Sequence, residues 1–144
     1  MPEVESLLEQ ARQAARNAYA PASGFRVGAA IAAEDGRVFT GVNIENASYG
    51  LSICAERVAL FKAISEGARG FTELAVVAGS DAGEEDAPPC GACRQVLLEF
   101  GPDMVLLMAG SRGVDGQVKR FTVSELVPEA FSAFTPGSDA EVQG

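Results

Sequence analysis

Apolar side chains recur at helical spacing at the start of the chain. The positions, three or four residues apart for the most part, are Val4, Leu7, Leu8, Ala11, Ala15 and Ala18. One face of a helix carries side chains at this spacing, so the pattern predicts an amphipathic helix over residues 4–19 that ends near Pro21.

Two more helices are expected further along the chain. The second begins near Cys54, and its inner side is expected to carry Val58, Phe61, Ile64 and Ala68. The third begins near Gly91 and is stopped by Gly101-Pro102. Its apolar positions are Cys93, Val96, Leu97 and Phe100.

Short apolar runs between turn signals predict strands. The expected strands are residues 26–33, 37–43, 74–78, 104–109 and 117–122. Glu34-Asp35-Gly36 predicts a hairpin turn between the first two. The continuous apolar run at 104–109 indicates a central strand, because both faces of such a strand are covered. Ser124 is expected to cap a short final helix.

Helices and strands follow one another without an internal repeat or a linker. In a chain of 144 residues this favours one α/β layer structure. We expect a single domain over residues 1–134 and a loose tail over 135–144. No apolar run approaches the ~20 residues that a membrane span needs, and no signal-peptide pattern opens the chain. The expected location is the cytoplasm.

The balance of charge narrows the class of partner. Twenty acidic residues against eleven basic ones give a formal net charge of -9. Such a field repels the phosphates of nucleic acids, and no cluster of Lys and Arg offsets it. A small molecule such as a free nucleoside is therefore a more natural ligand than a polynucleotide.

The candidate chemistry lies in three cysteines, in a chain without histidine. They occur in Cys54-Ala55-Glu56 and in the segment 89–93, Pro-Cys-Gly-Ala-Cys, which holds Cys90 and Cys93. Three thiolates fill three of the four tetrahedral positions of zinc and leave one for water, whereas a structural zinc normally takes four protein ligands. Both motifs fall at predicted helix starts, where the helix dipole favours anions. The pattern predicts one catalytic zinc ion per chain.

Glu56 and Arg57 are expected to act beside the zinc ion, Glu56 on its bound water and Arg57 on its thiolate ligands. Glu56 lies two residues from the first thiolate, near enough to move the protons of a zinc-activated water. Arg57, three residues from Cys54, is expected to donate hydrogen bonds to a thiolate and to offset its charge. Arg94 is the alternative to Arg57, and Gln95 is a further expected partner of the ligands.

The two cysteine motifs resemble those of the cytidine deaminases. The likeness to the small, homotetrameric members extends over the block 41–57, the block 89–100, and Ala20-Pro21 with residues 25–30. It covers roughly residues 4–134. The resemblance implies a three-layer α/β/α sandwich with a mixed sheet of about five strands. It also implies zinc-dependent hydrolysis of cytidine and 2′-deoxycytidine to uridine, 2′-deoxyuridine and ammonia, a reaction of pyrimidine salvage.

The resemblance also assigns the substrate-binding residues. Asn43 and Glu45 are expected to hold the ribose hydroxyls, and Phe25 to pack on the pyrimidine ring. The backbone of Ala55 and the carbonyl of Pro89 are expected to read the amide edge and the amino group of the base.

A further part of the site is expected to come from neighbouring subunits of a homotetramer. By the resemblance, Ala47, Tyr49 and Phe131 reach into the pocket of another chain. This chain departs from the family at Ala22, where relatives commonly carry tyrosine before the serine. The change affects packing near Tyr49 and Phe131 rather than the chemistry.

Other functions stay open at this point. The substrate could be another aminopyrimidine nucleoside, such as a nucleoside antibiotic. Cys90 and Cys93 could form a thiol–disulfide oxidoreductase, although Cys54 and Glu56 would then have no role. A zinc-stabilised binding module without catalysis is the third alternative, and the net charge of -9 disfavours a nucleic-acid partner for it.

Overall fold

The structure, a computed structural model, describes residues 3–78, 87–110 and 117–132. Five strands form one sheet in the order β2-β1-β3-β4-β5. Their bounds are β1 (Val27–Ala33), β2 (Val38–Val42), β3 (Phe71–Ala78), β4 (Val105–Ala109) and β5 (Lys119–Thr122). β3 and β4 are parallel, and the other neighbours are antiparallel. The sheet is therefore mixed, as expected.

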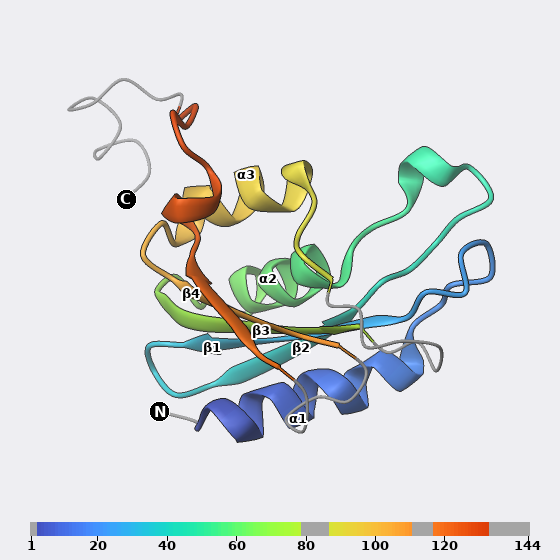
Figure 1. The fold of residues 1–144 in the computed structure, drawn as a ribbon, viewed down its shortest axis with the longest axis horizontal. Coiled ribbons are helices and arrows are strands. Elements are labelled where there is room, and N and C mark those ends of the chain that lie inside the picture. Colours follow the sequence, from blue (N-terminus) through green and yellow to red (C-terminus); the bar gives the residue numbers. More distant parts are fainter. Residues whose placement is uncertain (1–2, 79–86, 111–116, 133–144) are drawn as a thin grey trace.

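Helices cover both faces of this sheet (Figure 1). α1 (Val4–Ala14) lies on one face, while α2 (Ala55–Ser65) and α3 (Gly91–Phe100) lie on the other. The described residues also contain the short 3-10 helices η1 (Ala15–Asn17) after α1, η2 (Tyr49–Leu51) before α2, and η4 (Ser124–Leu126) after β5. The expected three-layer α/β/α fold is confirmed. Among the described residues, no helix is long and apolar enough to cross a membrane.

β1 shows why small residues lie at the centre of the fold. All seven of its residues are buried, because β2 and β3 flank it and helices cover both of its faces. Ala29, Ile31 and Ala33 join the core beneath α2 and α3, while Ala30 and Ala32 join the core beneath α1. This alternation follows from the two-residue period of a strand.

Two glycines let the helices approach the sheet closely. A Cβ at Gly28 would lie 1.9 Å from the backbone oxygen of Ala11 in α1. A Cβ at Gly41 would lie 2.4 Å from the backbone nitrogen of Ala59 in α2. Both contacts are with backbone, which cannot move aside without shifting a whole helix. These glycines therefore set the distance between the layers and, through α2, the place where Cys54 and Glu56 lie.

Replacing Gly41 with alanine is expected to lower the free energy of unfolding by at least about 1–3 kcal/mol, the usual range for an overpacked core. The added methyl group would push α2 away from β2. Thermal melting of the purified variant measures the loss. Gly50→Ala is the matched control, because a Cβ at that position meets nothing within 4 Å. Equal melting temperatures for Gly41→Ala and the parent protein would contradict the expected close contact.

Several expected boundaries need correction. The first helix is regular only to Ala14 and continues as 3-10 helix to Asn17, short of the predicted end near residue 19. β3 begins at Phe71, three residues before the predicted run, because it pairs with the whole of β1. Val123 rather than Ser124 is the residue that precedes the final 3-10 helix. The predicted loose tail lies outside the described residues.

The inner side predicted for α2 is confirmed only in part: Ile64 packs against the core and Ala68 is buried just after the helix. Its buried face carries Ala59, Leu60 and Ala63, whereas Phe61 is 44% exposed. Ala55 and Ala59 lie where α2 meets Gly41, because the helix backbone comes close to β2 at that point. The spacing of alanines, rather than of the largest apolar residues, marks the buried side of this helix.

Candidate functional site

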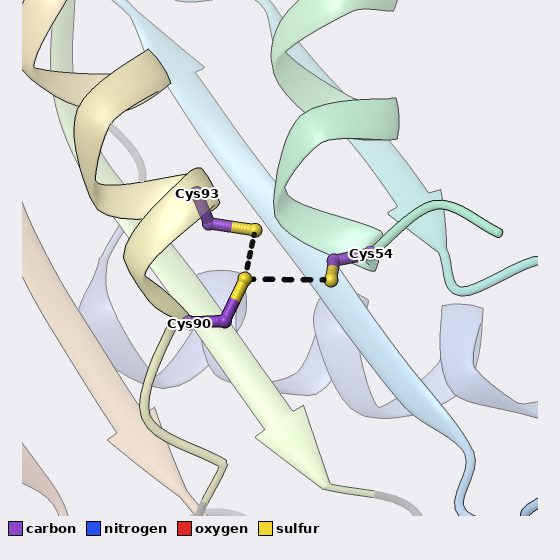
Figure 2. A group of neighbouring side chains, drawn as sticks. All are labelled: Cys54, Cys90 and Cys93. Atoms are coloured by element: carbon purple, nitrogen blue, oxygen red, sulfur yellow. Dashed lines mark hydrogen bonds between the residues drawn. The ribbon is translucent and has the colours of Figure 1, made fainter. Parts of the chain in front are cut away.

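The three thiols converge at the starts of two helices on the same face of the sheet (Figure 2). Cys54 immediately precedes α2, Cys90 immediately precedes α3, and Cys93 lies in the first turn of α3. The Sγ atoms of Cys54 and Cys90 are 3.9 Å apart, and those of Cys90 and Cys93 are 3.5 Å apart. All three sulfurs lie within 4.8 Å of one another.

These separations fit a single zinc ion. With Zn–S bonds of about 2.3 Å and tetrahedral angles, two thiolates on one zinc lie about 3.8 Å apart. The two shortest distances in the cluster lie on either side of that value. The free N–H groups at the starts of α2 and α3 also favour negative charge there.

The thiols influence one another's ionisation. The hydrogen bond with Cys93, with further help from Arg57, lowers the pKa of Cys54 to about 5. The pKa of Cys93 moves up in turn, because of its interaction with Cys54 and because of burial. One thiol therefore ionises readily, and its charge opposes ionisation of the next. A bound metal cation is the natural counter-charge that allows all three to be thiolates.

Arg57 is the positive charge nearest to Cys54. Its Nη2 donates to Cys54 Sγ at 3.6 Å, and the hydrogen bond raises the pKa of the guanidinium. Its Nε is buried without a hydrogen-bond partner among the described residues. Arg94, the alternative considered from the sequence, points elsewhere: Nε donates to the carbonyl of Pro89 at 2.8 Å and Nη1 to that of Leu126 at 3.2 Å.

Gln95 also has a different contact from the one expected. Its Nε2 donates to the backbone oxygen of Phe131 at 2.8 Å. In this structure Gln95 therefore holds the segment after η4 against α3 instead of supporting a thiolate. The sequence contained no signal for this contact, because the two residues lie 36 positions apart.

Glu56 is a buried carboxyl beside the thiols. It lies in the first turn of α2, and only 4% of its surface is exposed. Burial raises the pKa of this carboxyl to about 7, since removal from water disfavours the charged form. The nearby Cys54 charge acts in the same direction. A carboxyl with such a pKa can accept a proton and give it back near neutral pH.

A cavity of about 370 Å³ opens beside Glu56, and its size suits one small organic molecule. The residues that line it are Ser23, Phe25, Val27, Asn43, Glu45, Tyr49, Ser52, Ile53, Cys54, Ala55, Glu56, Ala87, Pro88 and Cys90. Eight of these were expected in the site from the sequence. The elements that meet here are the loop before β1, the loop after β2, and the starts of α2 and α3.

Two polar residues of the wall hold the loop before β1. Asn43 accepts from the N–H of Val27 at 2.9 Å and donates to the carbonyl of Phe25 at 2.8 Å. Glu45 is 6% exposed and accepts from the N–H groups of Ala22 and Ser23. The Ser23 hydroxyl also donates to Glu45, and this hydrogen bond lowers the pKa of the carboxyl. Sequence reasoning missed Ser23.

Some expected site residues lie outside the cavity lining. Pro89 is buried, and its carbonyl accepts a hydrogen bond from Arg94. Ala47 and Phe131 lie on the surface, and Phe131 is 72% exposed. Phe131 belongs to a set of large apolar side chains that are 43–73% exposed. The set is Tyr19, Ile44, Tyr49, Leu51, Phe61 and Phe131.

Comparison with known proteins agrees with this geometry. The family described as the cytidine and deoxycytidylate deaminase zinc-binding region matches residues 1–109, which include all three cysteines. The chain belongs to this family.

Individual members of the family are similar over most of their length. A cytidine deaminase of Halalkalibacterium halodurans is 50% identical over 129 residues, which are 90% of this chain and 94% of that protein. A cytidine deaminase of Sporosarcina psychrophila is 47% identical over 132 residues, 90% of this chain and 92% of the relative. The crystal structure of cytidine deaminase from Burkholderia pseudomallei superimposes with a TM-score of 0.82 at 44% identity, and covers 90% of this chain and 100% of that one.

The thiol cluster is therefore the zinc site of a cytidine deaminase family member. The three sulfurs within 4.8 Å and the matched zinc-binding region agree on one metal site in the described part of the chain. The alternative of a redox-active pair formed by Cys90 and Cys93 does not account for Cys54 beside them, and the cluster fits zinc instead.

Proposed function

We propose that this protein hydrolyses cytidine and 2′-deoxycytidine to uridine and 2′-deoxyuridine with release of ammonia. The observation that carries the proposal is Glu56, a buried carboxyl with a raised pKa, in the wall of a nucleoside-sized cavity beside three clustered thiols. The cytidine deaminases that are 47% and 50% identical to the chain support the same activity.

Proton transfer by Glu56 is the centre of the mechanism. Cys54, Cys90 and Cys93 would hold the zinc, which when bound lowers the pKa of a coordinated water. Glu56 takes a proton from the attacking water and delivers one to N3 of the pyrimidine, while the water oxygen bonds to C4. Glu56 then takes the second proton from the new hydroxyl on C4 and delivers it to the amino group, so that the C4–O double bond forms, the C4–N bond breaks, and ammonia leaves. Each step needs a carboxyl that both gains and loses a proton, as a pKa of about 7 allows.

The remaining walls of the cavity suit the base and the sugar. Phe25 offers an aromatic face to the pyrimidine ring, and the backbone at Ala55 offers polar groups to its amide edge. Asn43 and Glu45 are the polar residues for the ribose hydroxyls. The Pro89 carbonyl accepts one hydrogen bond from Arg94 and retains a second lone pair for the amino group of the base.

The assembly is proposed to be a homotetramer whose sites are completed by neighbouring chains. The support is the exposed apolar set, which includes Tyr49 beside the cavity and Phe131 on the segment held by Gln95. Contact with neighbouring chains would remove the apolar surface of these described side chains from water, which favours association. Ala47, Tyr49 and Phe131 are the residues proposed to enter a neighbour's pocket. A mass of four chains in sedimentation is the expected result.

We place the activity in pyrimidine salvage in the cytoplasm, in one catalytic domain over residues 1–134. Both the location and the metabolic role are part of the proposal, and localisation of the tagged protein in its own cells tests the first of them.

The proposed function is tested by following the ultraviolet absorbance of cytidine with purified protein, together with a count of zinc per chain. Conversion to uridine, one zinc per chain, and loss of activity with a strong chelator are expected. Zinc without conversion of cytidine or 2′-deoxycytidine would overturn the substrate assignment and direct attention to other aminopyrimidine nucleosides. Absence of both zinc and conversion would overturn the proposal as a whole.

A further inference from the structure

The hydroxyl of Ser23 connects two walls of the cavity. Its Oγ donates to Oε2 of Glu45 at 2.5 Å and accepts from the N–H of Phe25 at 3.0 Å. Since the Phe25 N–H points at the oxygen of Ser23, the hydroxyl proton is directed at the carboxylate. The hydroxyl therefore has one orientation, and Glu45 has a fixed donor on Oε2.

The hydrogen bonds of Glu45 leave little room for further donors. A carboxylate offers about four acceptor positions on its two oxygens. The N–H groups of Ala22 and Ser23 occupy Oε1 at 2.9 and 3.1 Å, and the Ser23 hydroxyl occupies one position on Oε2. One position remains on Oε2, and the side chain lines the cavity although only 6% of it is exposed.

We propose that Ser23 is a positioning residue that makes Glu45 accept a single sugar hydroxyl. The inference rests on the proposed function, because the ligand is taken to be a nucleoside. Three donors hold the carboxylate: the N–H of Ala22, the N–H of Ser23 and the hydroxyl of Ser23. Because the Glu45 carboxylate is held in one orientation, its last acceptor position on Oε2 can accept from a hydroxyl at only one position in the cavity.

This arrangement selects for a ligand that carries a hydroxyl donor. A site with a buried polar group rejects an analogue without the matching hydroxyl, because the group is then left unpaired. If the Ser23 hydroxyl is removed, Oε2 gains a second open position and Glu45 loses its charge-assisted partner. The carboxylate can then turn or bind water, so the advantage of the hydroxylated ligand falls.

The test uses two product analogues as competitive inhibitors of cytidine deamination by the zinc-loaded protein. Uridine carries the sugar hydroxyls, and 2′,3′-dideoxyuridine lacks both. Their inhibition constants are measured for the parent protein, Ser23→Ala, Ser23→Thr and Ser52→Ala. Ser52 is the matched control, since it lines the same cavity but its hydroxyl accepts from the N–H of Asn46.

Ser23→Ala is expected to raise the inhibition constant of uridine about 10- to 100-fold, the size of a lost hydrogen bond to a charged group. The inhibition constant of 2′,3′-dideoxyuridine should change by less than about twofold. The kcat for cytidine should also stay within about twofold, whereas the KM for cytidine should rise. Ser23→Thr keeps the hydroxyl and should restore the preference for uridine. Ser52→Ala should change both inhibition constants alike, which leaves their ratio unaltered.

Other results would overturn the inference. Equal weakening of both inhibitors by Ser23→Ala would show a general packing role, and a parent protein without preference for uridine would show that no hydroxyl is read. If Ser23→Ala does not fold, Ser23→Cys takes its place, because a thiol donates only weakly. An unchanged inhibitor ratio in Ser23→Cys would again overturn the inference. No turnover of cytidine by the parent protein would be the distinct failure of the proposed function, and the inference would fall with it.

Discussion

Replacing Glu56 with glutamine is expected to lower kcat for cytidine by about 100- to 10,000-fold, the usual contribution of a positioned acid–base group. Glutamine keeps the size of the side chain in its buried place but cannot carry a proton between water and base. Zinc and nucleoside should still bind, because the three thiols and the residues for the sugar are unchanged. Steady-state kinetics, zinc analysis and calorimetric binding of uridine measure the three properties separately.

The matched control for this variant is Glu99→Gln. Glu99 lies exposed on α3, so the same chemical change there removes charge without touching the cavity. Its kcat should equal that of the parent protein. Near-normal turnover by Glu56→Gln would remove Glu56 from the mechanism, and loss of zinc in that variant would show a role in holding the site together instead.

Replacing Cys93 with serine is expected to release the zinc and abolish turnover. A structural zinc site contributes about 10–16 kcal/mol in peptides, so one thiolate among three or four ligands accounts for about 3–5 kcal/mol, or roughly 10²- to 10⁴-fold in metal affinity. Serine is nearly the same size but does not ionise near neutral pH, and this side chain is fully buried. Zinc content after dialysis, and activity across a series of zinc-buffered solutions, measure the loss.

Leu97→Val is the control for damage to the core. Leu97 lies one turn after Cys93 on the same buried face of α3. This variant should melt at a lower temperature and retain one zinc per chain and its activity. Full zinc retention by Cys93→Ser would show that Cys54 and Cys90 suffice for the metal, contrary to the three-thiol site.

The metal site could be predicted from the sequence because its chemistry is confined to few residues at recognisable places. Thiols are rare in this chain, and both motifs lie where turn residues give way to helical spacing. Helix starts attract anions whatever the rest of the fold is, so Cys54 and Cys90 each carried a local signal. Their approach to 3.9 Å depends on α2 and α3 sharing one face of the sheet, which no local pattern in the sequence shows.

The packing of α2 could not be predicted in the same way. Helical periodicity is compatible with more than one face, and Phe61 and Val58 looked like the obvious apolar side. The face that is buried depends on the absence of a side chain at Gly41, a residue on another element. Such a fit between two surfaces is a tertiary property, and local patterns carry no record of it.

The hydrogen bonds around the cavity escaped prediction for a related reason. Asn43 and Glu45 were expected to face a sugar, yet both also bind the chain over residues 22–27. Ser23 meets Glu45 across 22 positions of sequence, in a loop whose path is set by the start of β1. A polar residue in a loop has many possible hydrogen-bond partners. The sequence can therefore indicate that such a residue belongs to a site, but it does not show which contacts the residue makes.

The position of the thiols also affects the stability of the whole molecule. Cys54 and Cys90 lie 36 positions apart in sequence and belong to different helices, so a shared metal ties the chain into a closed loop. By analogy with a disulfide that closes a loop of this length, such a tie is worth about 4 kcal/mol of lost chain entropy in the unfolded state. Unlike a disulfide, it survives in a reducing solution and opens to a chelator. Zinc would thus be a removable cross-link that stabilises the fold, in addition to its part in the reaction.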